Sequence, residues 1–344
     1  MKYRVLGSVA AAAAIAFAQP VGYLAQEAGK AAGILAAARK AIGGGKLDSL
    51  KTFTAQCQAQ RNVGGMQLDS DVEVYLELPD KYARVENMNG GPGMMISGGG
   101  TTGFNGPQLL QKIGAAAPGG GMVIRMGGGG PLPSSPAEKP TPEQLEQMKA
   151  VALRSAKTEV SRLMLGWFAG AHPAAQVDYT YLGDAESVEG KAYVIDVKNA
   201  DGFAARLFID QQSNLPLMVT YKAAKPRVMT QTMSAPAGGH GASTPASAVA
   251  SALASASASA PASASASAPA SAPAPASASA SAPAPPEMAD YTMYFEDWRD
   301  AGGVKFPFKM RRATEGNTVE EWSITKVALN PKIDAKKFAV ASGS

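Results

Sequence analysis

The chain has 344 residues, of which 46% are hydrophobic, 17% are charged and 7% are aromatic, with a formal charge of +4. One cysteine and two histidines exclude a disulfide scaffold and a Cys-based metal cluster, and they leave little room for a His-built metal site or a catalytic triad. The charge is too small to indicate a nucleic-acid partner, and no cofactor is expected.

Residues 1–18 have the three parts of a cleavable secretory signal. Lys2 and Arg4 form the positive region, an uncharged apolar stretch follows, and Ala16 and Ala18 are small residues before the expected cleavage point. The apolar stretch is shorter than the ~20 residues that span a bilayer. No cysteine lies close behind it, so no lipid attachment site is predicted. The sequence therefore predicts export to the periplasm.

The first folded segments are a helix at 26–42 and a pair of strands at 69–78 and 81–89. Valine and leucine alternate with acidic residues in the first strand, which is typical of a sheet with one buried face. In the second strand, Tyr82 is predicted on the apolar face, and Arg84 and Glu86 on the solvated face. Cys57, in an extended segment at 52–60, is predicted to be a packed free thiol.

Glycine dominates residues 89–133, with short apolar islands between the glycines. No phosphate-binding motif is present, so this region is interpreted as hairpin loops between short strands. A second helix is predicted to begin after Thr141, with Pro142 at its first position and Gln144 completing a capping box, and to end near Gly170. Its last turns are the most apolar, so burial is expected at its C-terminal end.

Alternating residues predict further strands between 177 and 221, with a turn at 183–190, and again between 291 and 327. Between these runs, residues 234–286 are nearly all Ala, Ser and Pro, a composition typical of a disordered linker. Because a long flexible loop is inexpensive to close, the tract is interpreted as an insertion in one domain formed by residues 19–233 and 287–344. Two tethered domains are the alternative.

Catalytic residues are sparse. His172 follows the second helix, where capping or solvent exposure is expected, and His240 lies in the Ala/Ser/Pro tract. The acidic pairs Asp297/Asp300 and Glu320/Glu321 are interpreted as a solvated sheet face. A hydrolase is left without a nucleophile and a base, and no enzyme is predicted.

The strands offer a continuous apolar face, and two helices are few for covering eight to eleven strands. Either the sheet folds into a sandwich, or it curls around the helices and leaves an apolar cavity; ordinary core packing is the alternative. The candidate ligand-contacting residues on this face are Val72, Val74, Leu76, Leu78, Tyr179, Tyr193, Ile195, Leu207, Ile209, Leu217, Phe295, Phe306, Phe308 and Trp322.

The order of these segments resembles the periplasmic lipoprotein-sorting superfamily, the LolA/LolB-like proteins with their LppX and RseB relatives. The similar segments are 37–50, 53–60, 73–82 (EVYLELPDKY) with Arg84, 101–106 (TTGFNG), 189–197 (EGKAYVIDV), 203–216 (FAARLFIDQQSNLP), 295–310 (FEDWRDAGGVKFPFKM) and 320–338. The glycine-rich region and the Ala/Ser/Pro tract depart from the usual carrier pattern. The basic residue that handles lipoprotein in LolA-type carriers has no match in this chain.

The resemblance implies a mainly β, α+β fold, in which a strongly curved antiparallel sheet forms a half-barrel closed by two or three helices. It also implies a non-enzymatic carrier or chaperone that receives acyl chains of lipids or lipoproteins. The alternative is an envelope protein-interaction or sensor module of the same fold, whose interior is filled by its own side chains.

Overall fold

The computed structural model describes residues 21–63, 65–89, 99–113, 122–127, 141–188, 190–225, 227–232 and 287–339. The predicted signal peptide at 1–18 and the tract at 234–286 lie outside the described residues. So does His240.

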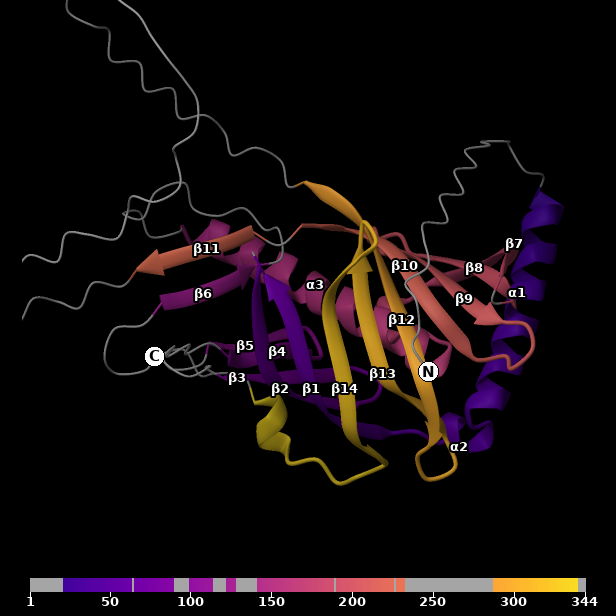
Figure 1. Cartoon of the computed structure of the whole chain (residues 1–344), viewed down its shortest axis with the longest axis horizontal. Helices are drawn as coiled ribbons and strands as arrows, with labels where there is room; N and C mark the ends of the chain where they lie inside the picture. Colours follow the sequence, from indigo (N-terminus) through magenta and orange to yellow (C-terminus); the bar gives the residue numbers. More distant parts are fainter. Residues whose placement is uncertain are drawn as a thin grey trace, which may run out of the picture. The chain divides into compact units, whose positions relative to one another are not determined.

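One antiparallel sheet of twelve strands, in the order β5-β4-β3-β2-β1-β14-β13-β12-β10-β9-β8-β7, dominates the described part of the chain (Figure 1). Its strands are β1 (Thr52–Val63), β2 (Met66–Glu77), β3 (Lys81–Asn89), β4 (Gly99–Asn105), β5 (Gln108–Ile113), β7 (Asp178–Ser187), β8 (Gly190–Lys198), β9 (Ala204–Asp210), β10 (Pro216–Ala224), β12 (Met288–Asp300), β13 (Lys305–Thr314) and β14 (Asn317–Leu329). A separate two-stranded sheet pairs β6 (Met122–Gly127) with β11 (Arg227–Thr232).

Strands that are distant in the sequence are neighbours in this sheet. β1 pairs with β14, and β10 pairs with β12, from Met218 opposite Tyr294 to Ala224 opposite Met288. The strands before and after residues 234–286 therefore belong to one sheet. It contains more strands than the eight to eleven that the sequence predicts.

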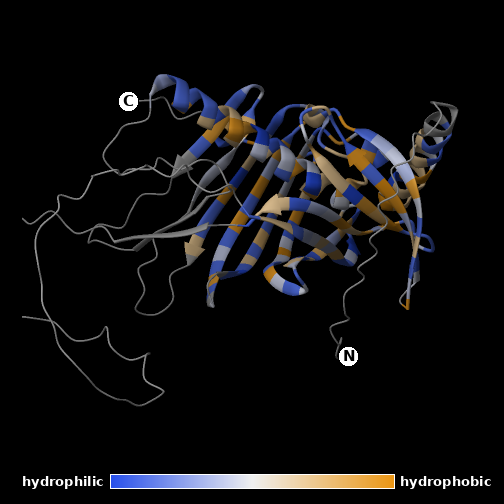
Figure 2. Ribbon diagram, turned by 90° about the horizontal axis from the view of Figure 1, so that it is seen from above, coloured by the Kyte–Doolittle hydropathy of each residue, from blue (hydrophilic) through white to orange (hydrophobic). Residues whose placement is uncertain are grey.

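Alternation along each strand separates the two faces of the sheet, as the bands of hydrophobic and hydrophilic residues in Figure 2 show. In β2, Val72, Val74 and Leu76 are buried while Asp71 is exposed. Residues directly opposite each other on paired strands share a face, so the burial of one strand continues across its neighbours.

Three α-helices and two short 3-10 helices accompany the strands in the described residues: α1 (Val21–Ile42), α2 (Gly45–Asp48), α3 (Pro142–Phe168), η1 (Pro173–Ala175) and η2 (Ala335–Phe338). The predicted start of α3 is confirmed. Thr141 caps the helix, its hydroxyl accepts from the Gln144 backbone N–H at 3.2 Å, and the Gln144 side chain accepts from the Thr141 N–H at 2.9 Å. None of the described helices combines the length and the apolarity that a bilayer crossing requires.

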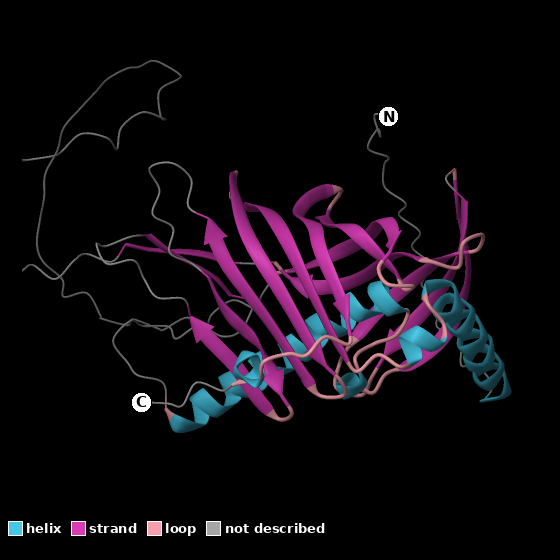
Figure 3. Cartoon of the chain, turned by 90° about the horizontal axis from the view of Figure 1, so that it is seen from below, coloured by secondary structure: helices cyan, strands magenta, loops and turns pink. Residues whose placement is uncertain are grey.

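The sheet curves around α3. This one helix contacts β4 and β5 near one edge of the sheet and also β9, β10 and β12 in the other half. In Figure 1 it passes behind β12, β13 and β14, and Figure 3 shows it along one face of the curved strands. α1 lies along β7 at the opposite edge. The half-barrel that the resemblance implies is thus confirmed: a curved, unclosed antiparallel sheet with helices.

Two β-bulges change the predicted positions of individual residues. The register between β7 and β8 shifts at Leu182, so β7 continues through Gly183 where a turn was expected. The register between β9 and β10 shifts at Leu217. In each bulge the extra residue leaves the alternation, and Leu182 is 51% exposed while Leu217 is 41% exposed.

Candidate functional site

The concave face of the sheet collects most of the predicted ligand-contacting residues, and the structure brings together strands from both halves of the chain to form it. Nine of these residues are buried in one core: Val72, Val74, Leu76, Ile195, Leu207, Ile209, Phe295, Phe306 and Trp322. Leu78, Tyr179, Tyr193 and Phe308 are partly buried against it. The prediction that Leu217 shares this face is wrong, because the bulge turns it toward solvent.

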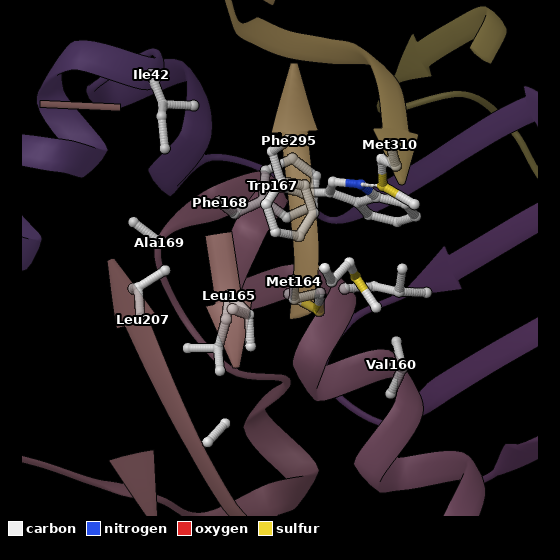
Figure 4. Packing of buried hydrophobic residues seen from close by; sticks show 14 of the residues in the cluster. Ile42, Val160, Met164, Leu165, Trp167, Phe168, Ala169, Leu207, Phe295 and Met310 are labelled. Carbon is white, nitrogen blue, oxygen red and sulfur yellow. Dashed lines mark hydrogen bonds between the residues drawn. The ribbon is translucent and has the colours of Figure 1, made fainter. Parts of the chain in front are cut away.

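Aromatic rings from the end of α3 fill one part of this concave face. Trp167 and Phe168 pack against Phe53 of β1 and Phe306 of β13, with ring centroids 5.2–6.2 Å apart. The Trp167 indole Nε1–H points to the Met310 sulfur at 2.9 Å. Figure 4 shows α3 presenting these side chains toward the strands. The C-terminal half of α3 is therefore an integral part of the core.

The contact between α3 and β12 is unusually close. A Cβ atom placed on Gly166 would lie 1.8 Å from Cζ of the Phe295 ring. Only glycine allows the helix backbone to approach the ring this closely.

The N-terminal half of α3 is different, because its apolar side chains are uncovered. Leu145, Met148 and Val151 are 41–42% exposed, whereas Val160 and Leu163 on the same helix are fully buried. Leu145, Met148 and Val151 are called the open stripe below. The predicted contrast between the two ends of this helix is confirmed.

A group of ionised side chains lies on the same concave face. This inner charge cluster consists of Arg61 (β1), Arg84 and Glu86 (β3), Glu159 (α3), Arg312 (β13) and Glu320 (β14). Arg61, Arg312 and Glu320 lie near the ends of their strands, and Arg61 is eight residues from Phe53 along β1, or about 26 Å at ~3.3 Å per residue. The concave face thus has an aromatic region and a charged region.

Glu320 is the centre of the cluster. Its Oε1 lies 2.7 Å from Arg61 Nε and 3.5 Å from Arg84 Nη2, and its Oε2 lies 3.0 Å from Arg312 Nη1. Glu159 reaches the same group from α3, with Oε1 2.5 Å from Arg312 Nη2. The cluster therefore joins the helix to the sheet.

Glu86 completes the cluster on the β3 side. It lies 2.7 Å from Arg61 Nη1 and 3.0 Å from Arg84 Nη2, and it accepts a hydrogen bond from the Ser70 hydroxyl at 3.0 Å. The Arg84 guanidinium also lies over the Trp322 ring at 4.7 Å. These contacts hold Arg84 against both acidic and aromatic neighbours.

The arginines keep all three carboxylates ionised. Burial opposes the charge on Glu320, but Arg312, Arg61 and Arg84 outweigh it and hold the pKa of Glu320 well below its usual range. The pKa values of Glu86 and Glu159 are lowered in the same way, against burial, by Arg84 and Arg61 for the first and by Arg312 and Arg84 for the second.

Several polar atoms around the cluster lack a hydrogen-bond partner among the described residues. They are the Tyr82 hydroxyl and the Nε atoms of Arg84, Arg162 and Arg312. Tyr82 is only 1% exposed, and burial raises the pKa of its hydroxyl. Buried polar groups in proteins are normally satisfied by protein, water or ligand, so these four atoms have unused hydrogen-bonding capacity.

The sequence interpretation missed this cluster. Arg84 and Glu86 lie two and four residues after Tyr82, so all three share one face of β3, and the prediction that Arg84 and Glu86 are solvated is wrong. Glu320 is likewise 4% exposed, and only its neighbour Glu321 lies on the solvated face. The even spacing within β3 was the signal that could have found the cluster.

His172 caps the short helix η1. Its Nδ1 accepts from the Ala174 backbone N–H at 3.2 Å, its ring meets Phe104 edge-on at 5.3 Å, and it is buried. Capping is confirmed, whereas solvent exposure is wrong. Burial lowers the pKa of His172 to about 4.

Cys57 is a buried free thiol, as predicted, and burial raises its pKa to about 12. Such a thiol is a weak nucleophile. Within the described part of the chain, no three His, Cys, Asp or Glu side chains are grouped closely enough to hold a metal ion.

No protein-family model and no curated protein sequence matches the chain. Solved structures similar to it include a DUF1329 family protein from Desulfovibrio piger (9% identity, 92% of this chain and 97% of that one, TM-score 0.44). A LolA superfamily protein from Nitrosomonas europaea is also similar (10% identity, 90% and 97%, TM-score 0.42). So is a domain described as an outer membrane lipoprotein-sorting protein from Vibrio parahaemolyticus (9% identity, 90% and 97%, TM-score 0.40). One of these solved structures is thus described as a member of the superfamily that the sequence resembles.

Proposed function

We propose that the protein is a non-enzymatic periplasmic binding protein that holds an acyl chain of a lipid or lipoprotein between α3 and the concave face of the sheet. The observation that carries this proposal is the difference in burial between the two halves of α3. Its C-terminal half is covered by the sheet, while the open stripe is 41–42% exposed. An uncovered apolar stripe that continues from a core is a surface on which an acyl chain gains burial.

The energetics favour an acyl ligand. Burial of each methylene contributes ~0.8 kcal/mol, so a dozen methylenes contribute several kcal/mol after the costs of ordering the chain. The site requires no catalytic group, which agrees with the small number of candidate catalytic residues in the sequence. The open stripe would contact the acyl chain along α3, and the buried apolar residues predicted from the sequence would hold α3 against the concave face.

A periplasmic location is part of the proposal. It is supported by the three-part signal predicted at residues 1–18 and by the single, buried cysteine.

The proposal is tested by native mass spectrometry of the protein purified without detergent, followed by titration with a fluorescent fatty acid. A variant with Leu145→Ser and Met148→Ser should bind the fatty acid at least tenfold more weakly and keep its Tm, because both side chains are already exposed. Leu182→Ser on β7, which is 51% exposed, is the matched control and should bind normally. The proposal is contradicted if the wild-type protein is purified without a bound acyl ligand and does not bind the fluorescent fatty acid.

A second function is favoured by the aromatic packing around Phe53, Trp167, Phe168 and Phe306. An interior filled to this extent suits an envelope interaction module that recognises another protein through its surface. Cross-linking in the periplasm distinguishes the two. An interaction module should capture a discrete protein in the wild type and equally in the Leu145→Ser/Met148→Ser variant.

A further inference from the structure

The charge balance of the concave face is uneven once Arg162 is included. Arg162 lies one turn after Glu159 on α3, and its guanidinium stacks on the Tyr221 ring at 3.8 Å. Within the described residues it makes no ion pair at 4.0 Å or less. Four arginines therefore face three glutamates, and the region carries one positive charge in excess.

Four of the six buried side-chain atoms without partners in the described part of the chain lie in this region. Three are arginine Nε–H donors, and the fourth is the Tyr82 hydroxyl, which can also donate. Tyr82 and Arg84 share the inner face of β3. Arg84 and Arg312 meet at the same two carboxylates, since Arg84 Nη1 lies 4.0 Å from the Glu159 oxygen that Arg312 also contacts. Donors that are gathered around an excess positive charge suit an acceptor that carries a negative charge.

The position of these donors relates them to the open stripe. Glu159 and Arg162 lie on α3 just beyond the turn where its apolar side chains pass from exposed to buried. An acyl chain that lies against the open stripe would therefore end beside the cluster. A single negative charge at that end would neutralise the excess.

We infer that the inner charge cluster with Arg162 and Tyr82 binds the monoanionic headgroup, a carboxylate or a phosphodiester, of an amphiphile whose acyl chain lies along α3. This inference rests on the proposed function and deepens it by naming the ligand class. Arg162 and the Tyr82 hydroxyl supply recognition, while the ion pairs among the other six residues hold the site in shape.

The test compares ligands that differ only in headgroup charge. Palmitate is compared with methyl palmitate, and lysophosphatidylglycerol with monopalmitoylglycerol, by competition with a fluorescent acyl ligand at pH 7 and low salt. Each anion should bind about tenfold more tightly than its neutral counterpart. Tyr82→Phe and Arg162→Gln should each reduce that ratio below threefold.

Tyr82→Phe removes a buried hydroxyl that has no partner among the described residues, so this variant should keep the wild-type Tm. Arg162→Gln also removes the stack on Tyr221, so the Tm of this variant is measured beside its binding ratio. Tyr294→Phe on the convex face is the matched control and should leave the ratio unchanged.

Each other outcome has a distinct meaning. Equal binding of anionic and neutral amphiphiles overturns the headgroup site while the proposed function stands, and the cluster is then structural and hydrated. Tight, Tyr82-dependent binding of acetate or inorganic phosphate, with no gain from an acyl chain, overturns the amphiphile and assigns a free-anion site. If no amphiphile binds at all, the proposed function fails and the inference fails with it.

Discussion

Glu320 shows how much depends on a single buried carboxylate. It is 4% exposed and contacts Arg61, Arg84 and Arg312, so Glu320→Gln would leave three arginines facing one another with one carboxylate fewer. We expect a loss of about 3–5 kcal/mol in the free energy of unfolding, measured by urea denaturation at pH 7. Glu321→Gln is the matched control. Its carboxylate pairs with Lys309 at 2.9 Å on the solvated face, and its loss should cost less than about 1 kcal/mol.

The same carboxylate predicts a pH dependence. The pKa of Glu320 in the folded chain lies below its ordinary value of 4.5, so its contribution to stability is complete above about pH 4.5 and is lost as the pH falls through the folded pKa. The difference in the free energy of unfolding between the wild type and Glu320→Gln should therefore decrease as the pH falls below 4.5. A difference that is constant from pH 7 to pH 3 would contradict an ionised Glu320 at the centre of the cluster.

His172 should also make the free energy of unfolding fall as the pH decreases, in a pH range above the one in which Glu320 titrates. Its pKa in the folded chain is about 4 against an ordinary 6.5, so the unfolded chain binds more protons between these values. Wild-type stability should fall by about 2–3 kcal/mol from pH 6.5 to pH 4 on this account. His172→Asn keeps a side-chain cap for η1 but does not titrate, and its urea midpoint should change less over this window. Identical pH profiles would show that His172 is not buried in its neutral form.

At the scale of elements, the seat of α3 on the sheet depends on Gly166. A Cβ at this position would meet the Phe295 ring, so Gly166→Ala should push the helix away from β12 and reduce the free energy of unfolding by about 1–3 kcal/mol. The control is Gly33→Ala on α1, where nothing lies within 4 Å and the substitution should stabilise the helix by about 0.5–1 kcal/mol. Similar effects of the two substitutions in thermal melts would refute close packing of α3.

The elements were largely predictable from the sequence because local chemistry determines them. The Thr141 capping box, the valine alternation of β2 and the apolar end of α3 each depend on neighbours within a few residues. The bulges at Leu182 and Leu217 were not predictable, because a bulge depends on the partner strand. Positions after a bulge keep their alternation, but the bulged residue itself leaves it.

The candidate site was predictable only in its apolar part. Runs of valine, leucine and phenylalanine at alternate positions indicate a buried face by themselves. The inner charge cluster combines residues from β1, β3, β13, β14 and α3, and burial of each charge is favourable only when the others are present. Spacing within β3 places Arg84 beside Tyr82, but only the fold brings Glu159 and Glu320 to it.

At the scale of the whole molecule, strands on both sides of residues 234–286 complete one sheet through the pairing of β10 with β12. We therefore propose that the tract is an insertion in a single domain. Replacing residues 234–286 by a short Gly/Ser linker should change the Tm by no more than a few degrees, since loop closure costs only ~0.6 kcal/mol per doubling of length. A large loss of stability would show that the tract contributes structure.

The most direct measurement of acyl binding along α3 uses a tryptophan introduced in the open stripe. Of the protein's own three tryptophans, Trp167 and Trp322 are buried in the core, while Trp298 in β12 is only partly buried. In a Trp298→Phe/Met148→Trp variant, a fatty acid brominated along its chain should quench the introduced tryptophan, because bromine acts at contact distance, and should leave the fluorescence of the buried pair unchanged. The unbrominated fatty acid should compete with the brominated one and restore the fluorescence. Fatty acid that binds without quenching would place the acyl chain away from α3 and contradict the proposed site.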